Sequence, residues 1–93
     1  VPVNIYRSGQ GGDGSIIVLC EQSWSIVDQL YALEEWLLKE GTKMESGDYI
    51  ADVGISPRTD FEDGVGGGAA FPPEAMAVMV EKGISLHISE YPL

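Results

Sequence analysis

The clearest hydrophobic pattern in the chain is that of an amphipathic helix. Four apolar residues recur at spacings of four, three and four, which aligns them along one side of a helix: Ile26, Leu30, Leu33 and Leu37. Ser25 is a favourable N-cap residue, and Asp28 three positions later resembles a capping box. Gly41 is expected to end the helix in the left-handed cap conformation. The pattern therefore predicts a helix over residues 25–40.

Other segments carry the patterns of β-strands. A β-favouring run at residues 3–6 and a continuous apolar run at residues 15–20 flank the turn-forming sequence RSGQGGDG, which predicts a hairpin. Residues 48–56 alternate so that four side chains share one face: Tyr49, Ala51, Val53 and Ile55. Pro57 ends this strand or marks it as an edge strand. Near the C-terminal end, three apolar residues alternate with polar ones in a further strand: Ile84, Leu86 and Ile88.

A second helix is predicted to begin at Pro72-Pro73 and to end at Gly83. Proline is tolerated at the first helical position, and Glu74 suits the positive end of the helix dipole. The apolar face of this helix is assigned to three residues: Met76, Ala77 and Val80. Residues 57–70, which precede the helix, are acidic and rich in glycine and are expected to form a long loop.

The order of these elements, ββαβαβ, predicts an α+β fold. We expect a two-layer sandwich in which a four-stranded, mainly antiparallel sheet carries both helices on one face. A chain of 93 residues suits one domain over residues 1–93 with one modest core.

Composition adds a large excess of negative charge. Fifteen Asp and Glu residues face five Lys and Arg residues, which gives a formal net charge of −10. Such a chain repels nucleic acid and anionic membranes and attracts basic protein surfaces, so direct binding of nucleic acid or membrane is not expected. Solubility alone also explains the charge, because carboxylates keep proteins dispersed. A single cysteine, Cys20, excludes an intramolecular disulfide and favours a reducing, cytoplasmic location.

Several motifs suggest a chemistry that their surroundings do not support. Residues 9–14 match G-x-G-x-x-G, but an apolar extended run follows where a dinucleotide site needs a helix. An EF-hand register on the cluster at 60–64 would place Phe61, which cannot bind calcium, at a ligand position. His87 and Cys20 are each the only residue of their type, which disfavours a catalytic triad and a zinc site. We therefore expect no catalytic residue, metal or cofactor, and acid–base catalysis by paired carboxylates stays a minor alternative.

The candidate partner-binding site is an acidic surface that contains an aromatic residue. Asp48 and Asp52 share one face of the predicted third strand, and the loop that follows supplies four more residues: Asp60, Phe61, Glu62 and Asp63. We expect the carboxylates to gather into one negative patch, with Phe61 or Trp24 as its aromatic anchor.

The last third of the chain resembles a known type of domain. Residues 71–76 (FPPEAM), residues 83–88 (GISLHI) and Tyr91 are similar to the closing helix–strand block of small bacterial domains of unknown function. Relatives of those domains include immunity proteins that neutralise secreted toxins. The resemblance, which covers residues 66–93 and carries over no functional residue, implies a toxin-neutralising or other inhibitory binder.

Charge and resemblance together lead to two expected functions, neither of them enzymatic. The first is a small acidic inhibitor, of an immunity or phage-encoded type, that occludes a basic surface of a toxin, a nuclease or a nucleic-acid-binding protein. The alternative is a structural or regulatory module of a larger or homo-oligomeric assembly. In a homodimer of that kind, the sheet face bearing Tyr49, Val53 and Ile84 would pack against a second copy.

Overall fold

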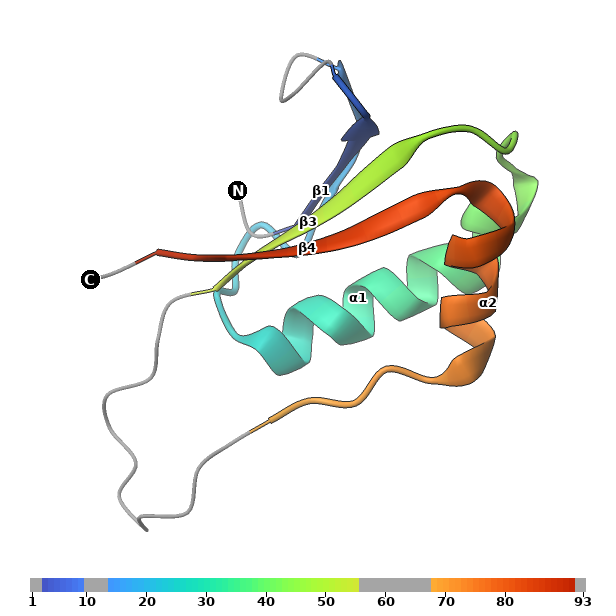
Figure 1. Ribbon diagram of the computed structural model, residues 1–93. Coiled ribbons are helices and arrows are strands. Elements are labelled where there is room, and N and C mark those ends of the chain that lie inside the picture. Colours follow the sequence, from blue (N-terminus) through green and yellow to red (C-terminus); the bar gives the residue numbers. More distant parts are fainter. Residues whose placement is uncertain (1–2, 10–13, 56–67, 92–93) are drawn as a thin grey trace, which may run out of the picture.

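The computed structural model describes residues 3–9, 14–55 and 68–91, which form one sheet and two α-helices (Figure 1). In chain order the elements are β1 (Val3–Arg7), β2 (Ser15–Leu19), α1 (Ile26–Lys39), the short 3-10 helix η2 (Gly41–Lys43), β3 (Tyr49–Ile55), α2 (Pro73–Lys82) and β4 (Ile84–Glu90). The predicted α+β class and the order ββαβαβ are confirmed. Of the loop expected at 57–70, only residues 68–70 are described, and they have no regular secondary structure.

The sheet has the strand order β2-β1-β3-β4 and is mixed rather than mainly antiparallel. β1 pairs antiparallel with β2, as the predicted hairpin requires, and also with β3, whereas β3 and β4 are parallel. The parallel pair arises because the connection through α2 returns the chain to the end of the sheet at which β3 began. The ladder between β3 and β4 is regular along the whole of β4, but the β1–β2 ladder shifts register between Ile5 and Tyr6, opposite Ile16.

Both helices cover the same face of the sheet, and the core lies between the two layers (Figure 1). The predicted stripe of α1 supplies the helix side, and alternating residues of β1 and β3 supply most of the sheet side: Leu30, Leu33 and Leu37 with Val3, Ile5, Tyr49, Ala51 and Val53. Tyr49, Val53 and Ile84 are 3%, 0% and 7% exposed. The face on which we expected a second copy is therefore the covered inner face, and that interpretation is wrong.

The N-terminus of α1 is held by Ser23 rather than by the predicted capping box. Ser25 occupies the N-cap position in an extended conformation, but its side chain makes no cap hydrogen bond. Instead the Ser23 hydroxyl donates to Asp28 Oδ2 over 2.7 Å, and the Ser25 N–H donates to Ser23 Oγ over 3.2 Å. The Asp28 carboxylate therefore stabilises the turn before the helix through a serine two positions earlier than expected.

Gly41 is not the left-handed cap of α1 that the sequence predicted. The C-cap residue is Glu40, which keeps a right-handed helical conformation, and Gly41 begins η2. A Cβ at Gly41 would lie 3.2 Å from a methyl of Leu37 and 3.4 Å from both Trp36 and Val78. Glycine therefore allows α2 to approach the end of α1 closely, and a side chain here would need Leu37 to shift slightly.

The buried face of α2 differs from the predicted one. Three residues at positions i, i+3 and i+4 face inward: Ala75, Val78 and Met79. The three residues assigned from sequence are all exposed: Met76, Ala77 and Val80. Val78 packs over Gly41 at the end of α1, so the contact between the two helices decides which side of α2 turns inward.

The two ends of α2 follow the predicted signals. Pro72 is the N-cap and Pro73 the first helical residue, and Gly83 adopts the left-handed cap conformation with φ of 77°. A Cβ at Gly83 would overlap the carbonyl oxygen of Gly47, whose N–H donates to the Lys82 carbonyl over 3.0 Å. Gly83 thus allows the start of β4 to lie directly against the segment that precedes β3.

At the other end of the sheet, two aromatic side chains close over Gly54. Trp24, which precedes α1, and Tyr91, which follows β4, form an edge-to-face pair with ring centroids 5.5 Å apart. A Cβ at Gly54 would lie 2.8 Å from the Tyr91 ring and 3.3 Å from the Trp24 ring. The pair therefore packs on the backbone of β3, which requires glycine at this position.

Candidate functional site

The two described residues of the predicted acidic site both belong to the β3 segment. Asp48 is exposed immediately before β3, and its carbonyl accepts a hydrogen bond from the Ser8 N–H over 2.9 Å. Asp52 lies in the middle of β3 and is half-buried, and its Oδ1 accepts a hydrogen bond from the Ser89 hydroxyl over 2.8 Å. The other four predicted residues lie outside the described residues: Asp60, Phe61, Glu62 and Asp63.

Asp52 belongs to the face of the sheet that neither helix covers, which we call the outer sheet face. Its residues alternate with the core residues along the strands: Asn4, Tyr6, Ile50, Asp52, Ser85, His87 and Ser89. The strand registers place Asn4, Asp52 and His87 in one row across β1, β3 and β4. A second row contains Tyr6, Ile50 and Ser85. The outer sheet face thus combines these polar groups with Tyr6, Ile50 and Val18, the register partner of Asn4 on β2, and the Trp24–Tyr91 ring pair lies at its end over Gly54.

The polar groups of the outer sheet face do not form a catalytic arrangement. His87 is exposed, and Ser85 and Ser89 flank it at two-residue spacing on the same strand, as predicted. The Ser89 hydroxyl donates to Asp52 rather than to the His87 imidazole. Within residues 3–9, 14–55 and 68–91, no group of three or more His, Cys, Asp or Glu side chains is placed to hold a metal ion.

Lysine side chains neutralise only a small part of the negative charge. Lys39, Lys43 and Lys82 each form an ion pair with a glutamate, namely Glu35, Glu40 and Glu81, at 2.7, 3.7 and 3.6 Å. The hydrogen bond that Lys39 Nζ donates to Glu35 Oε1, together with the negative charge of Glu35, raises the pKa of Lys39. The Arg7 guanidinium lies 5.6 Å from the centre of the Tyr49 ring.

The remaining described carboxylates form no ion pair and lie on both layers of the molecule. Eleven acidic residues are described, and three of them pair with lysine, which leaves eight: Glu21, Asp28, Glu34, Glu45, Asp48, Asp52, Glu74 and Glu90. Asp52 is on the outer sheet face, whereas Glu34 and Glu74 are on the helices behind it. The described carboxylates therefore lie on both layers, and because Asp60, Glu62 and Asp63 lie outside the described residues, the expectation of one negative patch stays a prediction.

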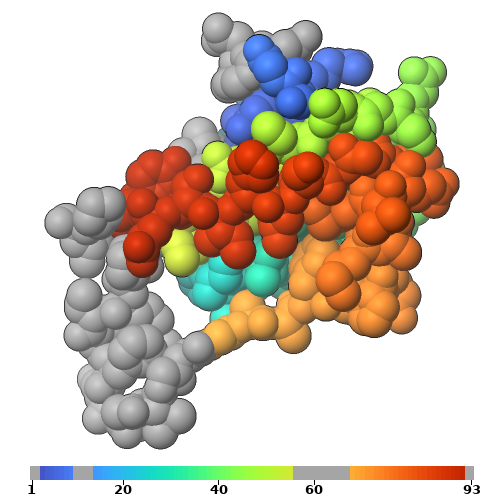
Figure 2. Space-filling model, viewed as in Figure 1, coloured from blue at the N-terminus to red at the C-terminus, as the bar shows by residue number. Residues whose placement is uncertain are grey.

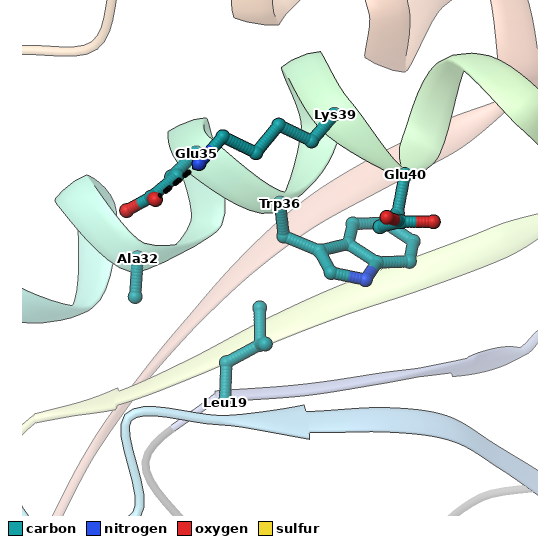
Figure 3. A pocket seen from close by; sticks show the side chains of 6 residues that line it. All are labelled: Leu19, Ala32, Glu35, Trp36, Lys39 and Glu40. Atoms are coloured by element: carbon teal, nitrogen blue, oxygen red, sulfur yellow. Dashed lines mark hydrogen bonds and ion pairs between the residues drawn. The ribbon is translucent and has the colours of Figure 1, made fainter.

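A shallow hollow of about 300 Å³ lies between β2 and α1, and no pattern in the sequence predicted it (Figure 3). Leu19 and Trp36 face one another across it, and Ala32 completes an apolar lining. The Glu35–Lys39 ion pair and Glu40 lie at its rim. The hollow has no inward polar group that would orient a substrate, so its chemistry is that of an apolar contact surface.

A second feature missed from sequence is the edge strand β4. Leu86 and Ile88 are register partners of Ala51 and Val53, which are fully buried, yet they are 41% and 56% exposed. Figure 2 shows β4 along the front of the molecule with part of α1 visible below it. The alternation of Leu86 and Ile88 identified their face correctly, but it did not reveal that the helices leave this part of the face uncovered.

Comparison of the chain with protein-family models, with curated proteins and with solved structures gives no match to any of them. The resemblance of the C-terminal third to immunity-related domains therefore stays a prediction. Neither α-helix in the described part of the chain is long and apolar enough to cross a membrane.

Proposed function

We propose that the protein is a small, non-catalytic, acidic binding module that docks on a basic surface of a partner protein and occludes it. The observation that carries the proposal is the outer sheet face, which neither helix covers and which bears Asp52 on its third strand, in a chain of net charge −10. A basic toxin, nuclease or nucleic-acid-binding protein has the complementary charge, because such proteins expose lysine and arginine for phosphate contacts.

Charge would act first, while the two proteins are still apart. Eight described carboxylates form no ion pair and lie on both layers of the fold, so their field attracts a basic partner. This attraction raises the association rate and is screened beyond about 8 Å at physiological ionic strength.

The outer sheet face would then supply the close contacts. Tyr6 and Ile50 are adjacent on β1 and β3 and are half-buried, which suits an aromatic and aliphatic contact at the centre of an interface. Asp52 and the exposed Asp48 would accept charge-assisted hydrogen bonds from arginine or lysine of the partner.

Photo-crosslinking from two tyrosine positions tests the proposal. A benzophenone amino acid replaces Tyr6 on the outer sheet face or, as the matched control, Tyr31, which is 66% exposed on α1 on the other side of the sheet. We expect position 6, and not position 31, to capture a protein of basic isoelectric point, which mass spectrometry identifies. Equal capture from both positions, or capture of acidic proteins only, would contradict the proposal.

The purified captured protein then allows a kinetic test. Added salt should slow association much more than it speeds dissociation. Asp52→Asn, which keeps an acceptor for Ser89, should lower the affinity for the captured protein. Glu74→Gln on α2 should slow association only, because it removes a charge that attracts the partner from a distance. An association rate that does not change with salt would exclude charge steering as the mechanism.

A further inference from the structure

The strand β4 has an edge with which no other described strand pairs. It is the last strand of the sheet, and among the described residues only β3 pairs with it. Its ladder with β3 runs over seven residues without a register shift, and no proline, lysine or arginine lies within Ile84–Glu90. Native proteins usually block such an edge with a bulge, a charge or a proline, because a free edge pairs with other chains.

The backbone groups on this edge can be assigned from the hydrogen bonds on the other side. The Tyr49 N–H donates to the Gly83 carbonyl and the Tyr91 N–H donates to the Ile55 carbonyl, so odd-numbered residues along β4 bond to β3. Since successive residues of a strand direct their N–H and C=O groups to opposite sides, Leu86 and Ile88 present theirs to the free edge. These are also the residues whose apolar side chains are exposed on the inner face.

The sequence of β4 is nearly symmetric about His87. Leu86 and Ile88 stand on either side of it, and Ser85 and Ser89 stand beyond them. If two copies pair antiparallel with His87 opposite His87, the strand overlaps along its whole length, Leu86 lies opposite Ile88, and Ser85 lies opposite Ser89. In this register Leu86 and Ile88 form the hydrogen-bonded pairs, which matches the direction of their backbone groups.

We propose that the protein forms a homodimer in which the β4 strands of two copies pair antiparallel about a two-fold axis at His87. The two sheets then form one continuous eight-stranded sheet, since each copy contributes four strands. Two Leu86–Ile88 pairs and two Ser85–Ser89 pairs across the axis are favourable cross-strand neighbours. A second copy fits this edge because the central residues Ser85–Ser89 are complementary to themselves, while at the two ends Ile84 lies opposite Glu90.

The opposite edge of the sheet is a poorer site for such pairing. β2 has five residues rather than seven, and the β1–β2 ladder is irregular next to it, between Ile5 and Tyr6. A bulge of this kind increases the local twist and discourages further pairing. Ile16 on β2 is 40% exposed, similar to Leu86, so it offers a matched control position.

The dimer and the complex with a basic partner should depend on salt in opposite directions. Each copy carries a net charge of −10, so the two copies repel one another and salt should strengthen the dimer by screening. The complex with a basic partner should be weakened by salt instead. The dimer and the proposed function can fail separately. A monomeric protein that still captures a basic partner would overturn only the dimer.

Analytical ultracentrifugation of the full chain over a concentration series measures the dimer directly. We expect a reversible dimer that salt strengthens. We expect Ile88→Lys to raise its dissociation constant about tenfold or more, because both Leu86–Ile88 pairs lose their apolar contact and each ammonium must be desolvated against Leu86. Ile16→Lys, the same substitution at the opposite edge, should leave the constant unchanged. A wild-type chain that stays monomeric, or equal weakening by the two variants, would overturn the proposal.

Disulfide trapping tests the register. In a Cys20→Ser background, His87→Cys places two thiols at a non-hydrogen-bonded pair with Cα atoms about 4.5 Å apart, which is within disulfide reach. Ser85→Cys places its two copies four residue steps apart, about 13 Å, which is out of reach. A disulfide-linked dimer from His87→Cys alone supports the proposed register. Cross-linking of both variants, or of neither, overturns it, and thermal unfolding of each variant shows whether it is folded.

Discussion

Replacing Gly83 with alanine should destabilise the fold by about 2–3 kcal/mol, because the residue combines a left-handed backbone with a backbone neighbour. Its φ is 77°, a conformation that costs an L-residue with a side chain roughly 1–2 kcal/mol. The new Cβ would also overlap the Gly47 carbonyl, so this segment must move. Moving it weakens a hydrogen bond to Lys82 or Gly83, each contributing about 1 kcal/mol.

Urea denaturation followed by circular dichroism measures this change. A domain of this size is stabilised by about 5–14 kcal/mol in total, so the loss is a large fraction. With a denaturant slope of about 1–3 kcal/mol per molar urea, the midpoint should fall by about 1–2 M. Gly68→Ala is the matched control, since Gly68 has no neighbour within 4 Å of the added carbon and no positive φ. A Gly83→Ala midpoint within about 0.3 M of the Gly68→Ala midpoint would refute this explanation of the cap.

Two further predictions concern the core and the cysteine. Leu33→Ala should lower the free energy of unfolding by about 2–5 kcal/mol, because Leu33 is fully buried. The control Leu38→Ala, at a site 42% exposed, should lower it by less than about 1 kcal/mol. Equal losses in urea denaturation would contradict the assignment of Leu33 to the core. Partial burial and the charge of Asp28 raise the pKa of the Cys20 thiol. Asp28→Asn should therefore increase the thiolate fraction and speed the reaction of Cys20 with a disulfide reagent at mildly alkaline pH. An unchanged rate would show that Asp28 does not raise this pKa. Because the raised pKa favours the thiol in the folded state, this contribution to stability is present at low pH and is lost as the pH rises through the folded-state pKa.

The parts of the fold that were predicted correctly depend on neighbours within a few residues. The helical stripe of α1, the Pro72-Pro73 start of α2 and the cap at Gly83 are all local patterns. The side of α2 that faces the core could not be predicted, because residues 75–80 (AMAVMV) are apolar at every position and several faces are equally plausible. The contact between Val78 and Gly41 selects one of them, and this contact joins residues 37 positions apart.

The candidate site was predictable in part for the same reason. Alternation along β3 placed Asp52 on the face away from the core, as the structure confirms. The charge count carries no information about where the carboxylates lie, and the described ones lie on both layers. Alternation along β4 also identified the face of Leu86 and Ile88, but exposure depends on which part of the sheet the helices cover, and this is decided by tertiary packing.

The ring pair over Gly54 provides an intrinsic optical reporter. Trp24 and Tyr91 lie on segments that are far apart in sequence, and their contact exists only while the C-terminal strand is docked beside β3. Energy transfer from tyrosine to indole at 5.5 Å should therefore be lost when that strand detaches. In a Trp36→Phe background, emission from the remaining indole would follow the docking of β4 separately from the melting of the helices.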